Sequence, residues 1–156
     1  MHDGADDSVY VERLGVPATW WLVAAFLTLS IWWTFVLATP SWFAASAAAA
    51  GGLAIVAGMW QYGSARVEVT NVHLRAGTAR VPLIYCGEAR ALDAQQTRAL
   101  HGPEANASAF FLVRPYIATS VRVEITDPRD PTPYWLVGSR NPEQLADALS
   151  ARAGRE

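Results

Sequence analysis

The chain has 156 residues and a formal net charge of −2. This balance gives no electrostatic basis for binding nucleic acid, which needs a clustered basic face. The single cysteine, Cys86, excludes an internal disulfide and a cysteine metal cluster. All 12 basic side chains counted as Lys or Arg are arginines.

The first structural signal along the chain is a long apolar segment. No Asp, Glu, Lys or Arg occurs between Arg13 and Arg66. The segment divides at a short polar turn into two stretches, each long enough as a helix to cross a hydrocarbon core of about 30 Å. The sequence therefore predicts a transmembrane hairpin over residues 14–62, with spans at about 18–39 and 43–61. The lipid bilayer is then the first partner of the protein.

The charges that flank this hairpin predict its orientation. Arg13 and Arg66 lie at its two ends, while the turn between the spans carries no charge. The positive-inside rule then places both termini in the cytoplasm, as in a multi-pass protein of the plasma membrane. A cleaved signal peptide is the rival interpretation of the first span, but the segment before it is acidic rather than basic.

The second span carries small residues at helical spacing. Ala47, Gly51, Ala54 and Gly58 follow one another at i, i+4, i+7 and i+11. Such a stripe lets another helix approach closely, and close packing drives helix association in lipid. Two occupants are open: the first span of the same chain, or a second helix from a homo-oligomer or another subunit.

Beyond Gly63 the hydrophobic pattern changes to a period of two, which is typical of strands. Asp93 is placed to cap a short helix over residues 94–100, and Asn141 to cap a C-terminal helix with Leu145 and Leu149 on its apolar side. We expect an α+β membrane protein in which residues 63–152 form a small antiparallel β-domain with a C-terminal capping helix, and residues 1–13 and 153–156 are tails. The predicted strands are 66–70, 72–75, 78–83, 88–92, 110–113, 117–126 and 134–137.

Two segments, 66–83 and 134–145, resemble a bacterial pleckstrin-homology-like domain in their order of strands, tight turns and final helix. The turn 71–73 lacks the basic cluster that the lipid-binding members of that class use. The whole chain is similar to the actinobacterial membrane proteins of domain-of-unknown-function family 3093, and this resemblance implies no activity. The motifs that carry it are Tyr10-x-Glu12-Arg13-Leu14, Trp20-Trp21, Tyr62-Gly63, Arg114-Pro115-Tyr116 and the Pro-rich segment 127–135.

Few residues of the predicted β-domain have a spacing typical of a catalytic, cofactor-binding or metal-binding site. Asp127 and Asp130 each precede a proline, a pattern of turns in which the side chain accepts a backbone N–H. The three histidines lie in unrelated segments, and Cys86 has no basic neighbour that would activate its thiol. We therefore predict no catalytic, cofactor-binding or metal-binding residue. A partner-binding or structural patch is the remaining candidate, made of Arg114, Tyr116, Asp127, Asp130, Tyr134 and Trp135.

Within this patch two roles are open for Arg114 and Tyr116. They can brace the fold by pairing with Asp127 or Asp130, or they can form an exposed recognition surface. The function predicted from the whole sequence is a non-catalytic, membrane-anchored interaction module with an unknown protein partner and no small-molecule substrate or cofactor. The alternative is a structural subunit or assembly factor of a membrane complex, acting through the Ala/Gly-rich hairpin.

Overall fold

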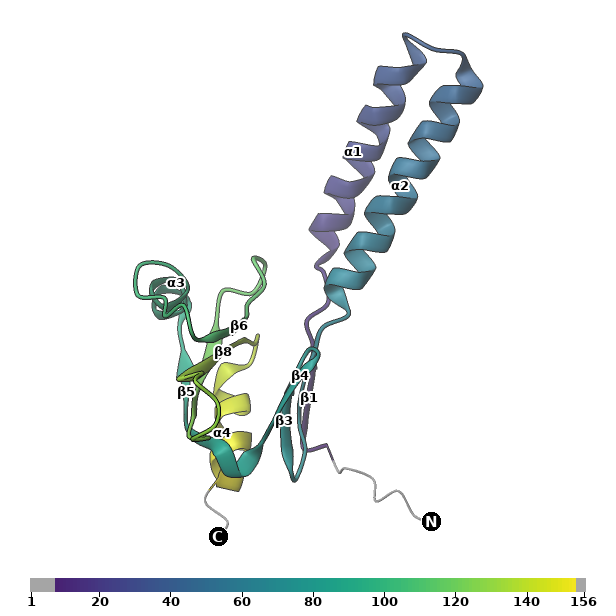
Figure 1. Cartoon of the computed structure of the whole chain (residues 1–156). Helices are drawn as coiled ribbons and strands as arrows, with labels where there is room; N and C mark the ends of the chain where they lie inside the picture. The colour runs from purple at the N-terminus through teal and green to yellow at the C-terminus, as the bar shows by residue number, and fades with distance from the viewer. Residues whose placement is uncertain (1–7, 154–156) are drawn as a thin grey trace, which may run out of the picture. The chain divides into compact units, whose positions relative to one another are not determined.

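The computed structural model describes residues 8–153, and the chain divides into two compact units. One unit is the helical hairpin, Gly15–Ser64. The other is a β-domain built from the chain on both sides of that hairpin. Figure 1 gives the course of the chain and the labels of its helices and strands.

The hairpin consists of α1 (Ala18–Val36) and α2 (Ser41–Gly63), joined by a short turn. Pro17 and Pro40 directly precede the two helices, a position that suits proline because its fixed φ angle fits the start of a helix. Both helices are long and apolar enough to cross a membrane. The expected spans are matched to within a few residues: α1 ends earlier and α2 begins earlier than predicted, because the turn includes Thr39 and Pro40.

The first sheet of the β-domain contains β1 (Tyr10–Arg13), β2 (Arg66–Val69), β3 (His73–Ala76) and β4 (Ala79–Pro82), hydrogen-bonded in that order. All three pairings are antiparallel. The prediction of an N-terminal tail over residues 1–13 is therefore wrong for Tyr10–Arg13. This segment is too short to reveal its pairing in the sequence, and its partner β2 lies more than 50 residues further along.

The second sheet contains β5 (Cys86–Leu92), β6 (Phe110–Leu112), β7 (Ser120–Ile125) and β8 (Tyr134–Gly138), in the order β5-β7-β8-β6. The expectation of an antiparallel domain needs correction here, because β6 pairs with β8 in parallel. Parallel strands need a long crossover connection. The connection from β6 to β8 runs through β7, which lies on the far side of β8, while the segment 93–109 with the helix α3 (Ala94–His101) carries the chain from β5 at one edge of the sheet to β6 at the other.

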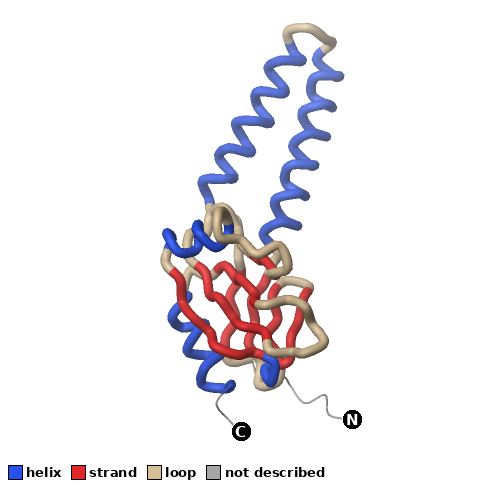
Figure 2. The backbone as a smooth tube through the Cα atoms, turned by 60° about the vertical axis from the view of Figure 1, so that its left-hand side comes forward, coloured by secondary structure: helices blue, strands red, loops and turns tan. Residues whose placement is uncertain are grey.

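Both faces of the second sheet are covered. Its inner face packs against the first sheet and α4 (Pro142–Ala153) in one continuous core, which includes Val121, Val123 and Ile125 of β7 as predicted from their alternation (Figure 2). Leu145 and Leu149 of α4 are 0% and 1% exposed in that core, as the apolar spacing indicated. A smaller cluster on the outer face joins Leu92, Tyr134 and Leu136 to residues of α3 and the loop after it.

Candidate functional site

A buried carboxylate of β1 forms the centre of the most connected polar network in residues 8–153. Glu12 is 9% exposed, and its side chain lies on the inner face of the first sheet because alternate residues of a strand point to opposite faces. One carboxylate oxygen accepts hydrogen bonds from the Tyr10 hydroxyl at 2.7 Å and the Ser139 hydroxyl at 2.6 Å. The other accepts the backbone N–H of Arg140 at 2.9 Å.

Ser139 extends this network to the junction between β8 and α4. Its hydroxyl accepts the backbone N–H of Asn141 at 3.0 Å, one residue before α4 begins. Its carbonyl accepts the hydroxyl of Thr119 at 2.6 Å. A carboxylate that receives three hydrogen bonds can stay charged in a buried position, where an unpartnered charge is very costly. The network therefore fixes β1 to the start of α4.

A second set of hydrogen bonds holds the end of β1 where the chain leaves for the hairpin. The Tyr116 hydroxyl donates to the Leu14 carbonyl at 2.7 Å, and the Leu14 N–H donates to the Ala65 carbonyl at 3.0 Å. Nη1 of Arg140 donates to the Arg13 carbonyl at 3.2 Å. We call the set formed by Tyr10, Glu12, Leu14, Tyr116, Ser139 and Arg140 the β1 clasp.

The clasp gathers two of the sequence motifs at one place: Tyr10-x-Glu12-Arg13-Leu14 and Arg114-Pro115-Tyr116. Sequence reasoning missed Glu12 and Ser139 as interacting residues. A signal for Glu12 was present, because a carboxylate alternates there with the aromatic Tyr10 and the apolar Leu14 and therefore points inward. Nothing in the sequence indicated Ser139.

Burial affects the acid–base properties of two groups in the β-domain. Desolvation raises the pKa of the Tyr10 hydroxyl to about 12, because the phenolate is disfavoured away from water. The neighbouring Glu12 adds to this effect by accepting a hydrogen bond from the protonated hydroxyl and by charge repulsion against the phenolate. Burial also raises the pKa of the Cys86 thiol to about 11, which agrees with the predicted inert cysteine.

The six residues of the predicted patch do not come together. Arg114 and Tyr116 follow the end of β6, while Asp127 and Asp130 follow the end of β7. Because β7 is antiparallel to β8 and β6 is parallel to it, these ends lie at opposite ends of the second sheet. The five-residue length of β8 separates them, so the sheet does not allow the predicted brace between them.

The remaining members of the predicted patch are either buried in the domain or engaged in turns. Tyr134 and Trp135 are each 5% exposed, and Trp135 stacks on Phe110 with ring centroids 4.5 Å apart. Asp127 accepts the N–H of Arg129 and Asp130 that of Thr132, each at 2.9 Å, the turn geometry expected before proline. The hydrogen bonds from Thr132 lower the pKa of Asp130.

The small-residue stripe of α2 is only partly used inside the hairpin. The buried positions of α2 are Ala44 and Ala48, and a methyl group at Gly52 would lie 3.1 Å from Thr28 of α1. Gly51 and Ala47 border this contact, whereas Ala54 and Gly58 are exposed, and a methyl at Gly58 would meet nothing within 4 Å. The contact face of α2 is therefore rotated from the predicted stripe, and Ala54 and Gly58 are exposed.

An apolar groove of about 520 Å³ runs along one side of the hairpin. Its floor includes Ala24, Ala48 and Gly52, and the rings of Trp21 and Trp32 line it from α1. Among residues 8–153, no three His, Cys, Asp or Glu side chains lie close enough together to hold a metal ion.

The fold and its clasp thus define a class of protein with an apolar two-helix hairpin inserted between the first two strands of a β-domain. The chain belongs to the family described as "Protein of unknown function (DUF3093)", whose match covers residues 9–149. That match includes the hairpin, both sheets and most of α4, and the resemblance stated from the sequence motifs is confirmed to this extent. No curated protein and no solved structure matches the chain.

Proposed function

We propose that this protein is a non-catalytic interaction module held at the plasma membrane by a hairpin that crosses the bilayer twice. In this proposal both termini and the β-domain are cytoplasmic. In the same proposal the β-domain, with its two sheets and final helix, is pleckstrin-homology-like and presents a surface to a protein partner.

The observation that carries the proposal is the pairing of the two strands that flank the hairpin. Arg13 of β1 and Arg66 of β2 are register partners, and Leu14 and Ala65 are joined by a backbone hydrogen bond. The chain therefore leaves for the hairpin and returns from it at the same edge of the β-domain. This topology requires an even number of crossings, because both flanking strands must be on one side of the membrane.

The surface of the hairpin supports insertion in lipid. In the most apolar stretch of each helix only 6% (α1) and 11% (α2) is buried. Large apolar side chains such as Leu22, Phe26 and Leu53 are therefore mostly exposed. A contiguous apolar surface of this kind is rare on a monomer in water. The hydroxyls of Thr28, Ser30 and Thr34 each donate to the carbonyl four residues earlier, so these polar groups are satisfied within the helix itself.

Cysteine labelling in intact cells tests the topology. Ser41→Cys places a thiol in the turn between the helices, and Ser64→Cys places one directly after α2, each in a Cys86→Ala background. A thiol reagent that does not cross membranes should label Ser41→Cys and leave Ser64→Cys unlabelled until the cells are opened. Labelling of Ser64→Cys alone in intact cells reverses the orientation, and labelling of both shows that the hairpin does not span.

A second function is favoured by the groove and by the exposed positions Ala54 and Gly58. A structural subunit of a membrane complex would present this small-residue surface to a helix of another protein. Co-purification separates the two functions. A partner that is lost when residues 66–152 are deleted supports the interaction module, and a partner that is lost after Ala54→Leu and Gly58→Leu supports the subunit.

A further inference from the structure

The outer face of the first sheet concentrates positive charge, although the whole chain has a net charge of −2. Strand alternation and burial place Arg13, Arg66, Arg75 and Arg80 on this face, all of them exposed. Register partners in an antiparallel sheet share a face. Arg13 is the partner of Arg66, and Arg75 is the partner of Arg80. We call this surface the arginine face.

Among the residues that the structure describes, carboxylates neutralise the arginine face only in part, through Glu68, the register partner of Arg75. Its acidic member is Glu68, so four positive charges and one negative charge leave an excess of three. The other acidic side chain of the sheet, Glu12, points to the opposite face and is engaged in the clasp. Within residues 8–153 none of the four guanidinium groups forms an ion pair. Val11, His73 and Pro82 complete the face.

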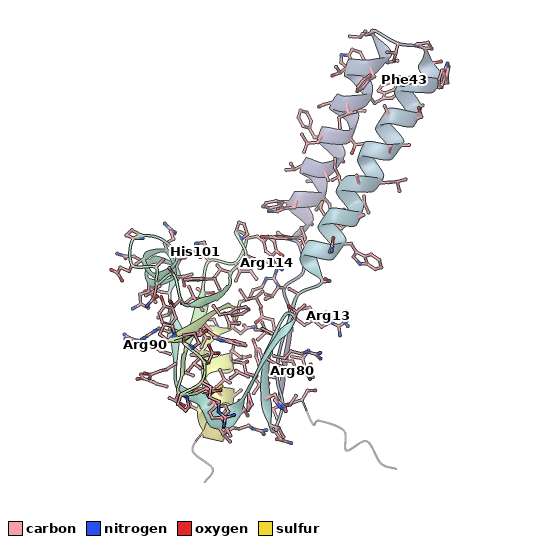
Figure 3. The ribbon with its side chains drawn as sticks, in the orientation of Figure 1. Arg13, Phe43, Arg80, Arg90, His101 and Arg114 are labelled. Atoms are coloured by element: carbon pink, nitrogen blue, oxygen red, sulfur yellow. The ribbon has the colours of Figure 1, made fainter. Side chains whose placement is uncertain are left out.

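The outer faces of the two sheets differ in net charge. On the outer side of the second sheet Arg90 and Arg122 are also register partners, but Glu88 and Glu124 share their face and balance its charge. In Figure 3 the side chains of Arg13 and Arg80 point away from the second sheet, and Arg90 lies on the opposite side of the domain.

Like charges placed opposite each other destabilise a sheet unless something outside it neutralises them. The arginine face contains two such pairs, Arg13 with Arg66 and Arg75 with Arg80. Arginine forms bidentate hydrogen bonds with phosphate, and its weak hydration suits a charged interface. The arrangement of four arginines over four strands therefore fits an extended polyanionic surface better than a single small anion.

The short linkers between the hairpin and the arginine face indicate which polyanionic surface this face can reach. Arg66 lies three residues after the end of α2 and Arg13 five residues before the start of α1. Even a fully extended chain covers at most about 3.3–3.6 Å per residue. If the hairpin spans the bilayer as proposed above, these two arginines cannot lie more than roughly 10–18 Å from the helix ends, which is within the head-group region or beside it.

From this geometry we infer that the arginine face binds the phosphate groups of anionic phospholipids in the same membrane that holds the hairpin. The inference rests on the proposed membrane insertion. Arg13 and Arg66 act as the anchor nearest the helices, and Arg75 and Arg80 extend the contact along the sheet. Each arginine near an anionic surface is expected to raise the affinity for it about fivefold, so neutralising two should lower it roughly 25-fold.

A photo-crosslinking experiment tests the inference on the full-length protein. Val11 lies on the face and is 53% exposed, so p-benzoylphenylalanine at this position reports what covers it. The protein is reconstituted in vesicles of phosphatidylcholine with about 30% phosphatidylglycerol, a mole fraction chosen to give the strongly anionic surface that recruits basic side chains. Mass spectrometry then identifies the lipid attached, at low and at high salt.

The expected result is an adduct enriched in phosphatidylglycerol beyond its share of the lipid, with the enrichment lost at high salt. Arg75→Gln combined with Arg80→Gln should abolish the enrichment. Arg98→Gln combined with Arg129→Gln is the matched control, because these two arginines are equally exposed but lie on α3 and on the loop after β7. Circular dichroism of each variant verifies that the β-domain is folded.

Three outcomes overturn the inference. Adducts that mirror the bulk lipid ratio show no selectivity for anionic head groups, and an equal loss in the control pair shows only a general charge effect. Crosslinking to a polypeptide in native membranes assigns the face to an acidic protein instead. Flotation with vesicles of phosphatidylcholine alone separates these failures from that of the proposed function, since a protein that does not float with neutral vesicles is not inserted at all.

Discussion

The carboxylate of Glu12 and the hydroxyl of Ser139, separated by 127 residues in the sequence, form a hydrogen bond of 2.6 Å. This contact joins the strand before the hairpin to the last strand of the β-domain. As a result, the two strands that precede and follow the hairpin in the sequence, β1 and β2, are both fixed within the β-domain. The stability of the β-domain should therefore depend on a segment that precedes the hairpin in the sequence.

Replacing Glu12 by alanine should destabilise the β-domain strongly. The substitution leaves the Ser139 hydroxyl and the Arg140 N–H without their acceptor in a buried site, which costs about 2–4 kcal/mol of unfolding free energy. Denaturant unfolding of the detergent-solubilised protein measures the change. Glu88→Ala is the control, because Glu88 is exposed on β5 and makes no hydrogen bond among residues 8–153. Equal losses in the two variants would contradict the clasp.

Tyr116→Phe should remove one hydrogen bond, from the Tyr116 hydroxyl to the Leu14 carbonyl. We expect a loss of about 1 kcal/mol, because the ring stays in place while the carbonyl loses its donor. Hydrogen exchange should also quicken at the end of β1. Tyr85→Phe is the matched control, since no hydrogen bond of its hydroxyl occurs among the residues described. The interpretation of Tyr116 fails if the two variants behave alike.

Two glycines of α2 should respond differently to alanine. At Gly52 the added methyl would lie 3.1 Å from Thr28, so the two helices must separate slightly and the hairpin loses stability. At Gly58 the methyl meets nothing within 4 Å, and alanine should be neutral or slightly favourable to the helix. Thermal unfolding in detergent compares them. A Gly58→Ala protein whose oligomer distribution shifts would instead show that a second helix packs on this surface.

The stability of the β-domain should fall at high pH. The pKa of Tyr10 is near 10.0 in the unfolded chain and about 12 in the folded one, so the folded state holds its proton more tightly. Its contribution is complete below pH 10 and is lost as the pH rises toward 12. Tyr10→Phe should make unfolding less sensitive to pH over this window. An unchanged pH profile would mean that Tyr10 is not buried as described.

Cys86 should react slowly with thiol reagents at pH 8 in the folded protein. Burial raises its pKa from 9.0 to about 11, and only the thiolate is nucleophilic. The unfolded chain in denaturant should react much faster. Rapid labelling of the native protein would show that the inner face of β5 opens frequently to solvent. The same measurement on Glu12→Ala tests whether the clasp keeps that core closed.

Much of the architecture could be predicted from local pattern alone. The hairpin followed from the absence of charge between Arg13 and Arg66. The short helix after Asp93 followed from capping chemistry, and the structure contains the complete capping box, with Gln96 reaching back to the Asp93 N–H. The inward positions of β7 followed from alternation. Each of these signals operates within one element, where spacing along the chain determines which side chains share a face.

The remaining features depended on contacts between distant segments, and only the tertiary structure decided them. The pairing of β1 with β2, the parallel direction of β6 and the hydrogen bond between Glu12 and Ser139 join residues that no local spacing relates. The predicted patch is wrong for the same reason, because the order and direction of the strands place Arg114 and Asp127 at opposite ends of the second sheet. Sequence periodicity determined what each element buries, and the order and direction of the strands decided which buried and exposed groups meet.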